Sequence, residues 1–211
     1  MDTPTPDFDP AAAAGAFTLA PGRVAVPGDE RHPGYVYERS ITMAVRVALA
    51  TGRPLLVTGE PGVGKSTLAA SIARVGGFAY REQVVTSRTQ ARDLMWRYDA
   101  VRRLADAQAR RLRPTSHYVK PQALWWAFDP AGAAAFAGEP VPPSPPALTV
   151  VLIDEIDKAE PDVPNDLLEA LDREQFTVDD LDAAPQVKGG RHQVLMLITS
   201  NRERELPPAF L

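Results

Sequence analysis

The segment that most constrains the fold of this chain is Gly59-Glu60-Pro61-Gly62-Val63-Gly64-Lys65-Ser66. It matches the phosphate-loop pattern G-x-x-x-x-G-K-[ST] at every fixed position. A short apolar run, Leu55 to Val57, precedes it, and a helical apolar pattern that ends at Gly76-Gly77 follows it. In such a strand–loop–helix unit, backbone N–H groups and the positive end of the helix meet at one phosphate-binding point. The segment therefore predicts an α/β domain built around a phosphate-binding loop.

The loop residues have distinct predicted roles toward a nucleoside triphosphate. The glycines allow the sharp backbone turn that brings successive N–H groups toward the phosphates. Lys65 is predicted to reach the β and γ phosphates, and the Ser66 hydroxyl is predicted to bind Mg²⁺. The predicted nucleotide-binding set is Gly59, Glu60, Pro61, Gly62, Val63, Gly64, Lys65, Ser66 and Thr67.

Two further apolar runs end in polar residues of the type that such a site needs. Val150 to Ile153 is followed by Asp154 and Glu155, and the run from Val194 ends in Thr199-Ser200-Asn201. In open α/β sheets the ligand lies at the carboxyl ends of the strands. We expect Asp154 to hold Mg²⁺, directly or through water, and Glu155 to act as the general base on the attacking water. Asn201 is expected to orient that water without adding charge.

Strand and helix patterns alternate along the chain, which indicates a mostly parallel sheet. Residues 1 to 34 contain six prolines and are predicted to be a loose leader before a domain at residues 35–211. Residues 121–147 are predicted to be irregular, with a proline-rich connection at 140–146 and a core segment, rather than a binding surface, at 124–128. The other expected elements are helices over 36–50, 65–75 and 162–171, one long helical pattern from Leu94 to Leu112, and strands over 83–86, 148–153 and 194–199.

Composition excludes several classes of site. The chain has no cysteine, so a disulfide framework, a thiolate zinc site, an iron–sulfur cluster and a cysteine nucleophile are excluded. Acidic residues number 27 against 23 basic ones, which gives no overall case for a nucleic-acid partner. The arginines around the long helical pattern favour a solvated basic face over a partner surface. No signal or membrane-spanning segment is recognised, and we expect a cytoplasmic protein without a membrane partner.

With these motifs the chain resembles the AAA+ ATPases, and within them it is similar to the MoxR-like group, from about Tyr35 to Leu211. Residues 59–66 match the Walker A motif, residues 152–155 close the Walker B motif, and Asn201 lies where the family carries its sensor-1 residue. The stretch from Asp157 to Leu171 also resembles that group. The resemblance implies a P-loop three-layer sandwich, a hairpin or loop over 176–194, and adenine contacts near residues 36–41. It also implies Mg²⁺-dependent ATP hydrolysis by a ring, usually a hexamer, that remodels or matures a protein client.

In the family, a segment like Leu206 to Leu211 is normally followed by an arginine finger, a fifth core strand and a helical lid. We therefore expect this chain to lack the lid, to bind nucleotide better than it hydrolyses it, and to have the strand at 55–57 at a sheet edge. Three alternatives stay open: a nucleotide-dependent switch or scaffold with little turnover, a nucleic-acid motor of the same class, and a small-molecule kinase.

Overall fold

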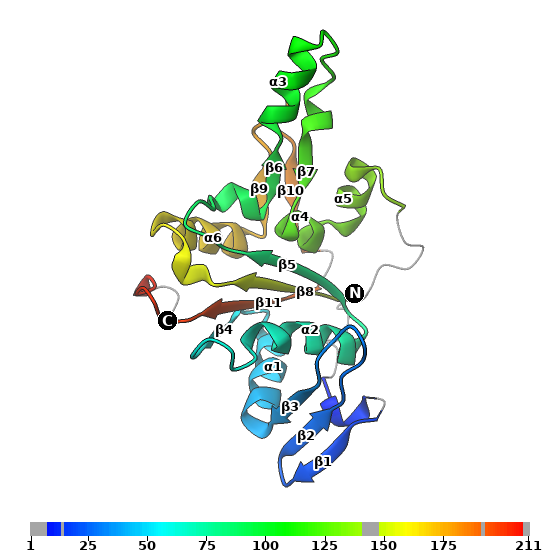
Figure 1. Cartoon of the computed structure of the whole chain (residues 1–211), viewed down its shortest axis with the longest axis vertical. Helices are drawn as coiled ribbons and strands as arrows, with labels where there is room; N and C mark the ends of the chain where they lie inside the picture. Colours follow the sequence, from blue (N-terminus) through cyan, green and yellow to red (C-terminus); the bar gives the residue numbers. More distant parts are fainter. Residues whose placement is uncertain (1–7, 14, 141–147, 191–192, 209–211) are drawn as a thin grey trace.

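A central parallel sheet organises the protein. The computed structural model describes residues 8–13, 15–140, 148–190 and 193–208. Four strands form the sheet in the order β4 (Leu55–Thr58), β11 (Gln193–Ser200), β8 (Leu148–Asp154) and β5 (Ala79–Val84), as Figure 1 shows. All three pairings are parallel, which confirms the predicted α/β class. The strand expected at 83–86 begins earlier, at Ala79, because residues 79–84 pair with β8.

The sheet has a hydrophobic core on each face. Along β8, Val151 and Ile153 belong to one buried cluster, whereas Val150 and Leu152 belong to the other. Helices α1 (Arg39–Thr51) and α2 (Lys65–Gly76) cover one face, and α4 (Ala123–Phe128) and α6 (Asp162–Arg173) cover the other (Figure 1). Because successive side chains of a strand point to opposite faces, a strand buried on both sides must be apolar throughout. This explains the apolar run of residues 150–153 within β8, although the buried Thr149 interrupts the apolar residues of the strand, and the two covered faces give the three-layer sandwich.

The parallel register brings the carboxyl ends of three strands to one edge of the sheet. β11 lies between β4 and β8, pairing Ser200 with Thr58 on one side and Ile198 with Ile153 on the other. The loops that follow these strands therefore leave the sheet at the same edge. Among the described strands, β4 is at the end of the strand order, in agreement with the expected edge position of the strand at 55–57.

The expectation that residues 1–34 lack regular structure is wrong for residues 17–26. β1 (Phe17–Ala20), β2 (Arg23–Val26) and β3 (Tyr35–Glu38) form an antiparallel sheet, preceded by the 3₁₀ turn η1 (Pro10–Ala12). The prolines at 21, 27 and 33 lie in the connections, where they interrupt no strand pairing. The helix expected from residue 36 begins at Arg39, because residues 35–38 pair with β2. A domain boundary at 34/35 stays a prediction.

The long helix expected from Leu94 to Leu112 is also wrong. This stretch contains η2 (Ala91–Leu94), β6 (Trp96–Tyr98) and α3 (Ala100–Gln108), and it returns through η3 (Thr115–Tyr118) and β7 (Val119–Pro121). β6 pairs antiparallel with β7, and the side chain of Asp99 caps α3 by accepting the N–H of Arg102. The helical spacing is thus interrupted by a strand. α3 has no buried residue and stands away from the sheet (Figure 1).

The stretch expected to be irregular contains two helices in its described part, α4 and α5 (Pro130–Ala137). Asp129 starts α5 by accepting the N–H of Gly132 at 2.9 Å. Leu124, Trp125 and Phe128 are buried, which confirms that this segment belongs to the core. The proline-rich connection lies outside the described residues from position 141 onward.

The remaining elements follow the predicted order. α6 is followed by a hairpin of β9 (Gln175–Thr177) and β10 (Gln186–Lys188), in the interval where the family resemblance implied a hairpin or loop. The short turn η4 (Ile156–Lys158) connects β8 toward α6. None of the helices in the described ranges is long and apolar enough to cross a bilayer.

Tyr37 gives a test of how the N-terminal sheet attaches to the core. Its ring is fully buried, and its hydroxyl donates to Ser71 Oγ on α2 at 2.8 Å. We expect Tyr37→Phe to lower the free energy of unfolding by about 1 kcal/mol, because one buried hydrogen bond is lost while packing is kept. Urea titration would measure it. Tyr98→Phe, at a half-buried tyrosine, is the control, and an equal loss in both variants would contradict the assignment.

Candidate functional site

The loop between β4 and α2 has the backbone conformation that an anion-binding loop requires. Gly62 and Gly64 have φ values of 81° and 94°, in the left-handed region that favours glycine. Among the described residues, none accepts a hydrogen bond from the backbone N–H of Gly62, Val63 or Gly64. Gly64 is the N-cap of α2, so these donors lie at the positive end of a helix. The loop can therefore offer several N–H groups to one phosphate group.

Lys65 is held across this loop. Its Nζ donates to the carbonyl oxygens of Gly59 at 2.7 Å and Glu60 at 2.9 Å, and the residue is only 8% exposed. The ammonium is therefore fixed beside the free N–H groups rather than extended into solvent. A positive charge at this point adds to the attraction that the helix end exerts on an anion.

Ser66 joins the loop to the acidic end of β8. Its Oγ donates to Asp154, with distances of 3.0 Å to Oδ1 and 2.9 Å to Oδ2. The Thr199 hydroxyl on β11 also donates to Asp154 Oδ1, so the carboxylate accepts from two different elements. Serine and aspartate oxygens at this distance are suitable ligands for Mg²⁺.

The Ser66 and Asp154 pair cannot enclose a metal ion alone. In the described part of the chain, no three His, Asp or Glu residues gather as a potential metal site. Mg²⁺ is commonly bound by one or two protein groups together with water and substrate phosphates. The donor set therefore fits an ion that arrives with a phosphate ligand.

Glu155 lies next to Asn201, as the strand order requires. Its Oε1 accepts from Asn201 Nδ2 at 3.2 Å, and its Oε2 accepts from Lys158 Nζ at 2.7 Å. The hydrogen bond to Glu155 raises the pKa of Lys158, so this lysine is cationic at neutral pH. Glu155 itself has a φ of 60°, and its N–H donates to Thr199 Oγ1 at 2.9 Å. Thr199 thus fixes the turn that carries both carboxylates.

Asp157 is a residue of this site that the sequence reasoning missed. Its side chain is 2% exposed and accepts the N–H of Asn201 at 3.3 and 3.2 Å and the N–H of Glu203 at 2.8 Å. Asp157 therefore holds the turn after β11 against the turn after β8. The sequence offered one signal, an aspartate two positions after the acid pair, but a charged residue next to a turn is usually exposed.

Arg202 and Arg204 fasten the same turn from outside. Arg202 Nη2 donates to Thr58 Oγ1 at the end of β4 at 2.7 Å, and Arg204 Nη1 donates to the Ala159 carbonyl oxygen at 3.2 Å. The polar groups after three neighbouring strands are thus connected to one another. The predicted residues Lys65, Ser66, Asp154, Glu155 and Asn201 lie at one edge of the sheet.

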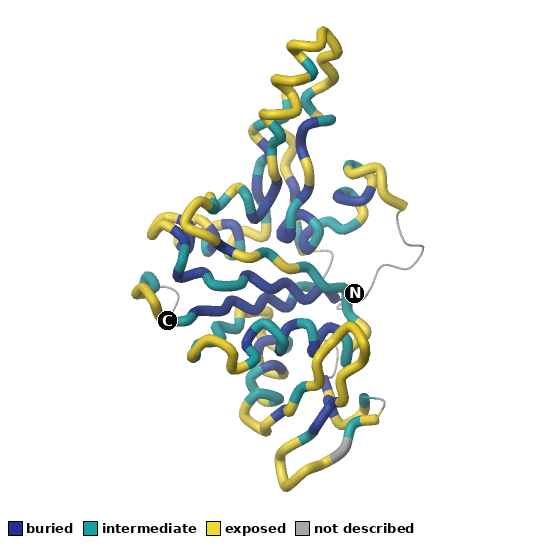
Figure 2. The backbone as a smooth tube through the Cα atoms, in the orientation of Figure 1, coloured by how far each residue is buried: buried dark blue, intermediate teal, exposed yellow. Residues whose placement is uncertain are grey.

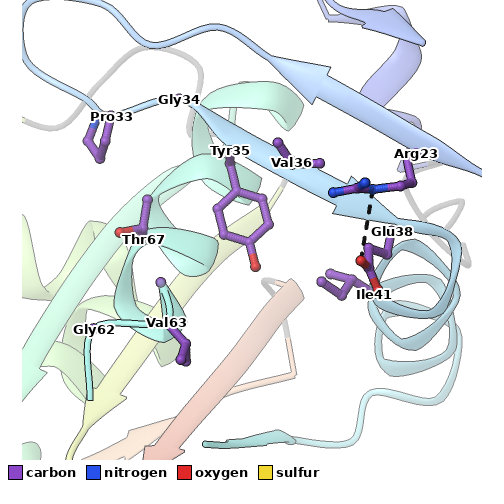
Figure 3. A pocket seen from close by; sticks show the side chains of 11 residues that line it. Arg23, Pro33, Gly34, Tyr35, Val36, Glu38, Ile41, Gly62, Val63 and Thr67 are labelled. Carbon is purple, nitrogen blue, oxygen red and sulfur yellow. Dashed lines mark ion pairs between the residues drawn. The ribbon is translucent and has the colours of Figure 1, made fainter. Parts of the chain in front are cut away.

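A hollow of about 380 Å³ opens beside the loop. Tyr35 projects into it from β3, with Val63 and Thr67 opposite, as Figure 3 shows. Burial raises the pKa of the Tyr35 hydroxyl, which keeps the ring neutral. The rim of the hollow carries an ion pair in which Arg23 Nε lies 3.9 Å from Glu38 Oε1. The lining residues are Arg23, Pro33, Gly34, Tyr35, Val36, Glu38, Ile41, Gly62, Val63, Gly64 and Thr67. The sequence reasoning missed Arg23, Pro33 and Gly34, which it had assigned to the leader.

Comparison with known proteins gives a matching family model and many similar solved structures. The family described as "AAA domain (dynein-related subfamily)" matches residues 54–211. A crystal structure described as a "putative ATPase" from Cytophaga hutchinsonii is 17% identical with a TM-score of 0.49. The match covers 79% of this chain and 42% of that one, so this chain spans less than half of that protein's length. No curated protein matches the sequence.

The buried contacts of Asp157 generate a stability prediction. We expect Asp157→Ala to lower the free energy of unfolding by about 1–3 kcal/mol, because it leaves the N–H groups of Asn201 and Glu203 without their acceptor. Urea denaturation followed by circular dichroism would measure the change. Asp166→Ala, on the exposed side of α6, is the matched control and should stay within about 0.5 kcal/mol of the parent. Two equal losses would contradict the prediction.

Proposed function

This chain belongs to the AAA family of the dynein-related type, and on that premise we propose that it binds ATP with Mg²⁺ and hydrolyses the γ-phosphate. The observation that carries the proposal is the contact of Ser66 with Asp154, 88 positions apart in the sequence, at 2.9 and 3.0 Å. Phosphate loops occur with many chemistries, but this contact joins the loop to a pair of carboxylates. Binding and hydrolysis thus share one edge of the sheet.

The loop residues divide the work of binding. The N–H groups of Gly62, Val63 and Gly64 and the ammonium of Lys65 bind the phosphate oxygens and compensate for their lost hydration. The oxygens of Ser66 and Asp154 would hold Mg²⁺, which would supply positive charge to offset the negative charge of the phosphates. Thr67, which follows Ser66 in α2, completes the proposed nucleotide-binding set together with Gly59, Glu60 and Pro61.

Glu155 and Asn201 act on the water. Glu155 accepts a proton from the attacking water. At the same time the water oxygen forms a bond to the γ-phosphorus, and the bond between the γ-phosphorus and the leaving ADP oxygen breaks. Asn201, whose amide lies 3.2 Å from Glu155 Oε1, orients that water without adding charge. Lys158 Nζ donates to Glu155 Oε2 at 2.7 Å and so holds the carboxylate beside Asn201.

The hollow next to the loop is the proposed position of the nucleobase. Val36, Glu38 and Ile41 line it, and they belong to the segment in which adenine contacts are expected. The Tyr35 ring and the Val63 side chain offer apolar surface on which a base can stack. The hollow is next to the phosphate donors, because Gly62 and Gly64 both line the hollow and belong to the loop.

For the whole protein we propose a MoxR-like role, in which a ring of subunits uses ATP to remodel or mature a protein client. The support is the sequence resemblance over the Walker motifs and residues 157–171. The second candidate is a nucleotide-dependent switch with little turnover. It is favoured by the engagement of both Glu155 oxygens, one by Asn201 and one by Lys158. Micromolar nucleotide affinity with almost no phosphate release would select the switch.

The proposed role of Lys65 predicts a loss of affinity. We expect Lys65→Ala to weaken Mg-ATP binding by about 100-fold or more, because a buried ammonium at the phosphates is removed. Isothermal titration calorimetry would measure the dissociation constant. Lys188→Ala, on the exposed face of β10, should bind like the parent. Equal affinity in the parent and Lys65→Ala would defeat the site assignment.

The proposed role of Glu155 predicts a separation of binding from turnover. We expect Glu155→Gln to keep nucleotide affinity within a few-fold and to slow phosphate release by about 10²–10⁴-fold, because the amide cannot accept the proton. Calorimetry and single-turnover phosphate release would measure the two quantities. Glu160→Gln, at an exposed glutamate nearby, is the control. Undiminished release from Glu155→Gln would assign the base to another residue.

A further inference from the structure

Residues 96–121, here called the arm, project from the α/β core. The arm consists of β6, α3, η3 and β7, and in Figure 1 it extends away from the sheet, with α3 at its tip. Its base is well anchored. The Trp96 ring stacks on Phe176 at 5.8 Å, and Trp96 Nε1 donates to Asp180 Oδ2 at 2.8 Å. Figure 2 shows the exposed tip beyond a buried base.

The arm has a defined structure of its own, and both of its acidic side chains are used to build it. Asp99 accepts the N–H of Arg102 at 2.9 Å, and Asp106 accepts the Tyr118 hydroxyl at 2.9 Å. The Tyr118 oxygen in turn accepts the N–H of Arg113 at 3.0 Å. These bonds close the arm around the buried Tyr118 ring. Its surface is therefore a fixed display of side chains rather than an unstructured loop.

The arm is strongly basic on an acidic protein. It contains seven Arg and Lys residues and two Asp, which leaves sixteen basic and twenty-five acidic residues in the rest of the chain. All seven are exposed: Arg97, Arg102, Arg103, Arg110, Arg111, Arg113 and Lys120. Within the described residues, the side chains of Arg97, Arg102, Arg103, Arg110 and Arg111 make no hydrogen bond or ion pair. A salt-bridged surface would pair these charges, so the arm is complementary to an acidic partner.

The same tip exposes large aliphatic side chains. Val101, Leu104 and Leu112 are 81%, 61% and 56% exposed. Val101 and Leu104 are three positions apart on α3, so they share a helix face, and no other element of the described part of the chain covers it. Apolar side chains gathered among polar ones on a projecting element are characteristic of a protein-interaction surface.

We propose that the arm binds an acidic polypeptide segment that also carries aliphatic side chains. Carboxylates of the partner pair with the free guanidinium groups, which bind them in a bidentate manner, and its aliphatic side chains cover Val101, Leu104 and Leu112. A nucleic acid would satisfy the arginines only. Proteins that bind single strands offer exposed aromatic rings to the bases, whereas Trp96 and Tyr118 are buried and Tyr98 is half-buried.

Fluorescence anisotropy with three labelled probes tests the proposal. The probes are a peptide of about 16 residues that alternates pairs of Glu and Leu, the same peptide with Ser in place of Leu, and an oligothymidylate of equal charge. We expect the Glu–Leu peptide to bind at least about 10-fold more tightly than either other probe, and its affinity to fall as salt is raised. Tighter binding of the oligothymidylate, or equal binding of the two peptides, would overturn the proposal.

Substitutions locate the binding surface. Arg103→Glu with Arg110→Glu, and separately Val101→Ser with Leu104→Ser, should each weaken binding of the Glu–Leu peptide at least about 10-fold. Arg53→Glu with Arg173→Glu changes the net charge equally at exposed positions outside the arm and should leave the affinity within about 2-fold. Because these side chains are exposed, circular dichroism should show a native fold in each variant. Equal weakening by arm and control variants would overturn the proposal.

Two further measurements distinguish peptide binding by the arm from the proposed ATPase function and from self-association of the chain. Lys65→Ala, which targets the nucleotide site, should bind the peptide like the parent, so the arm and the proposed ATPase function can fail independently. Light scattering without peptide would show whether the chain associates with itself. Self-association that the Arg103→Glu, Arg110→Glu variant abolishes would assign the arm to contact with a second copy and overturn the proposal.

Discussion

The candidate site depends on the parallel pairing of β11 between β4 and β8. This arrangement places the ends of three strands, Thr58, Asp154 and Ser200, at one edge of the sheet. A slip of one residue in β11 would move its side chains to the opposite face and take Thr199 away from Asp154. The two cores on β8 and β11 prevent that slip, because alternate residues of each strand are buried on both sides. Packing in the two cores thus fixes the positions of the polar groups at this edge of the sheet.

The site was largely predictable from sequence because its parts lie in contiguous motifs. The loop residues follow one strand and start one helix, and the acid pair ends the most apolar run of the chain. The strands around them were predictable because strands buried on both faces are continuously apolar. What could not be predicted was how the motifs support one another. The hydrogen bonds from Thr199 to Asp154 and from Asn201 and Glu203 to Asp157 join segments more than forty positions apart, and no local pattern records them.

The arm shows the opposite case, in which a good local pattern led to a wrong structure. Leu94, Tyr98 and Val101 have helical spacing, but Leu94 ends a 3₁₀ turn, Tyr98 lies in a strand and Val101 lies in the exposed helix α3. Periodicity assumes that apolar residues face a core, and at the tip of the arm there is none. The prolines before residue 34 led to the wrong expectation that residues 1–34 lack regular structure. Prolines that lie in the connections between short strands give the same proline-rich sequence as a disordered segment.

The N-terminal sheet has a practical consequence for where the chain can be cut. Phe8 and Val26 are buried in the same cluster as Tyr37, Leu68 and Ile72, and Phe8 packs edge-on against the Tyr37 ring at 5.6 Å. Arg74 on α2 is also bonded to the carbonyl oxygen of Pro27 at 2.8 Å. A fragment that starts at the first residue of the recognisable ATPase sequence would lose these covering groups and uncover the apolar side of α2. Expression designs guided by motif boundaries alone would therefore also remove part of the lining of the hollow beside the phosphate loop, including Arg23 and Tyr35.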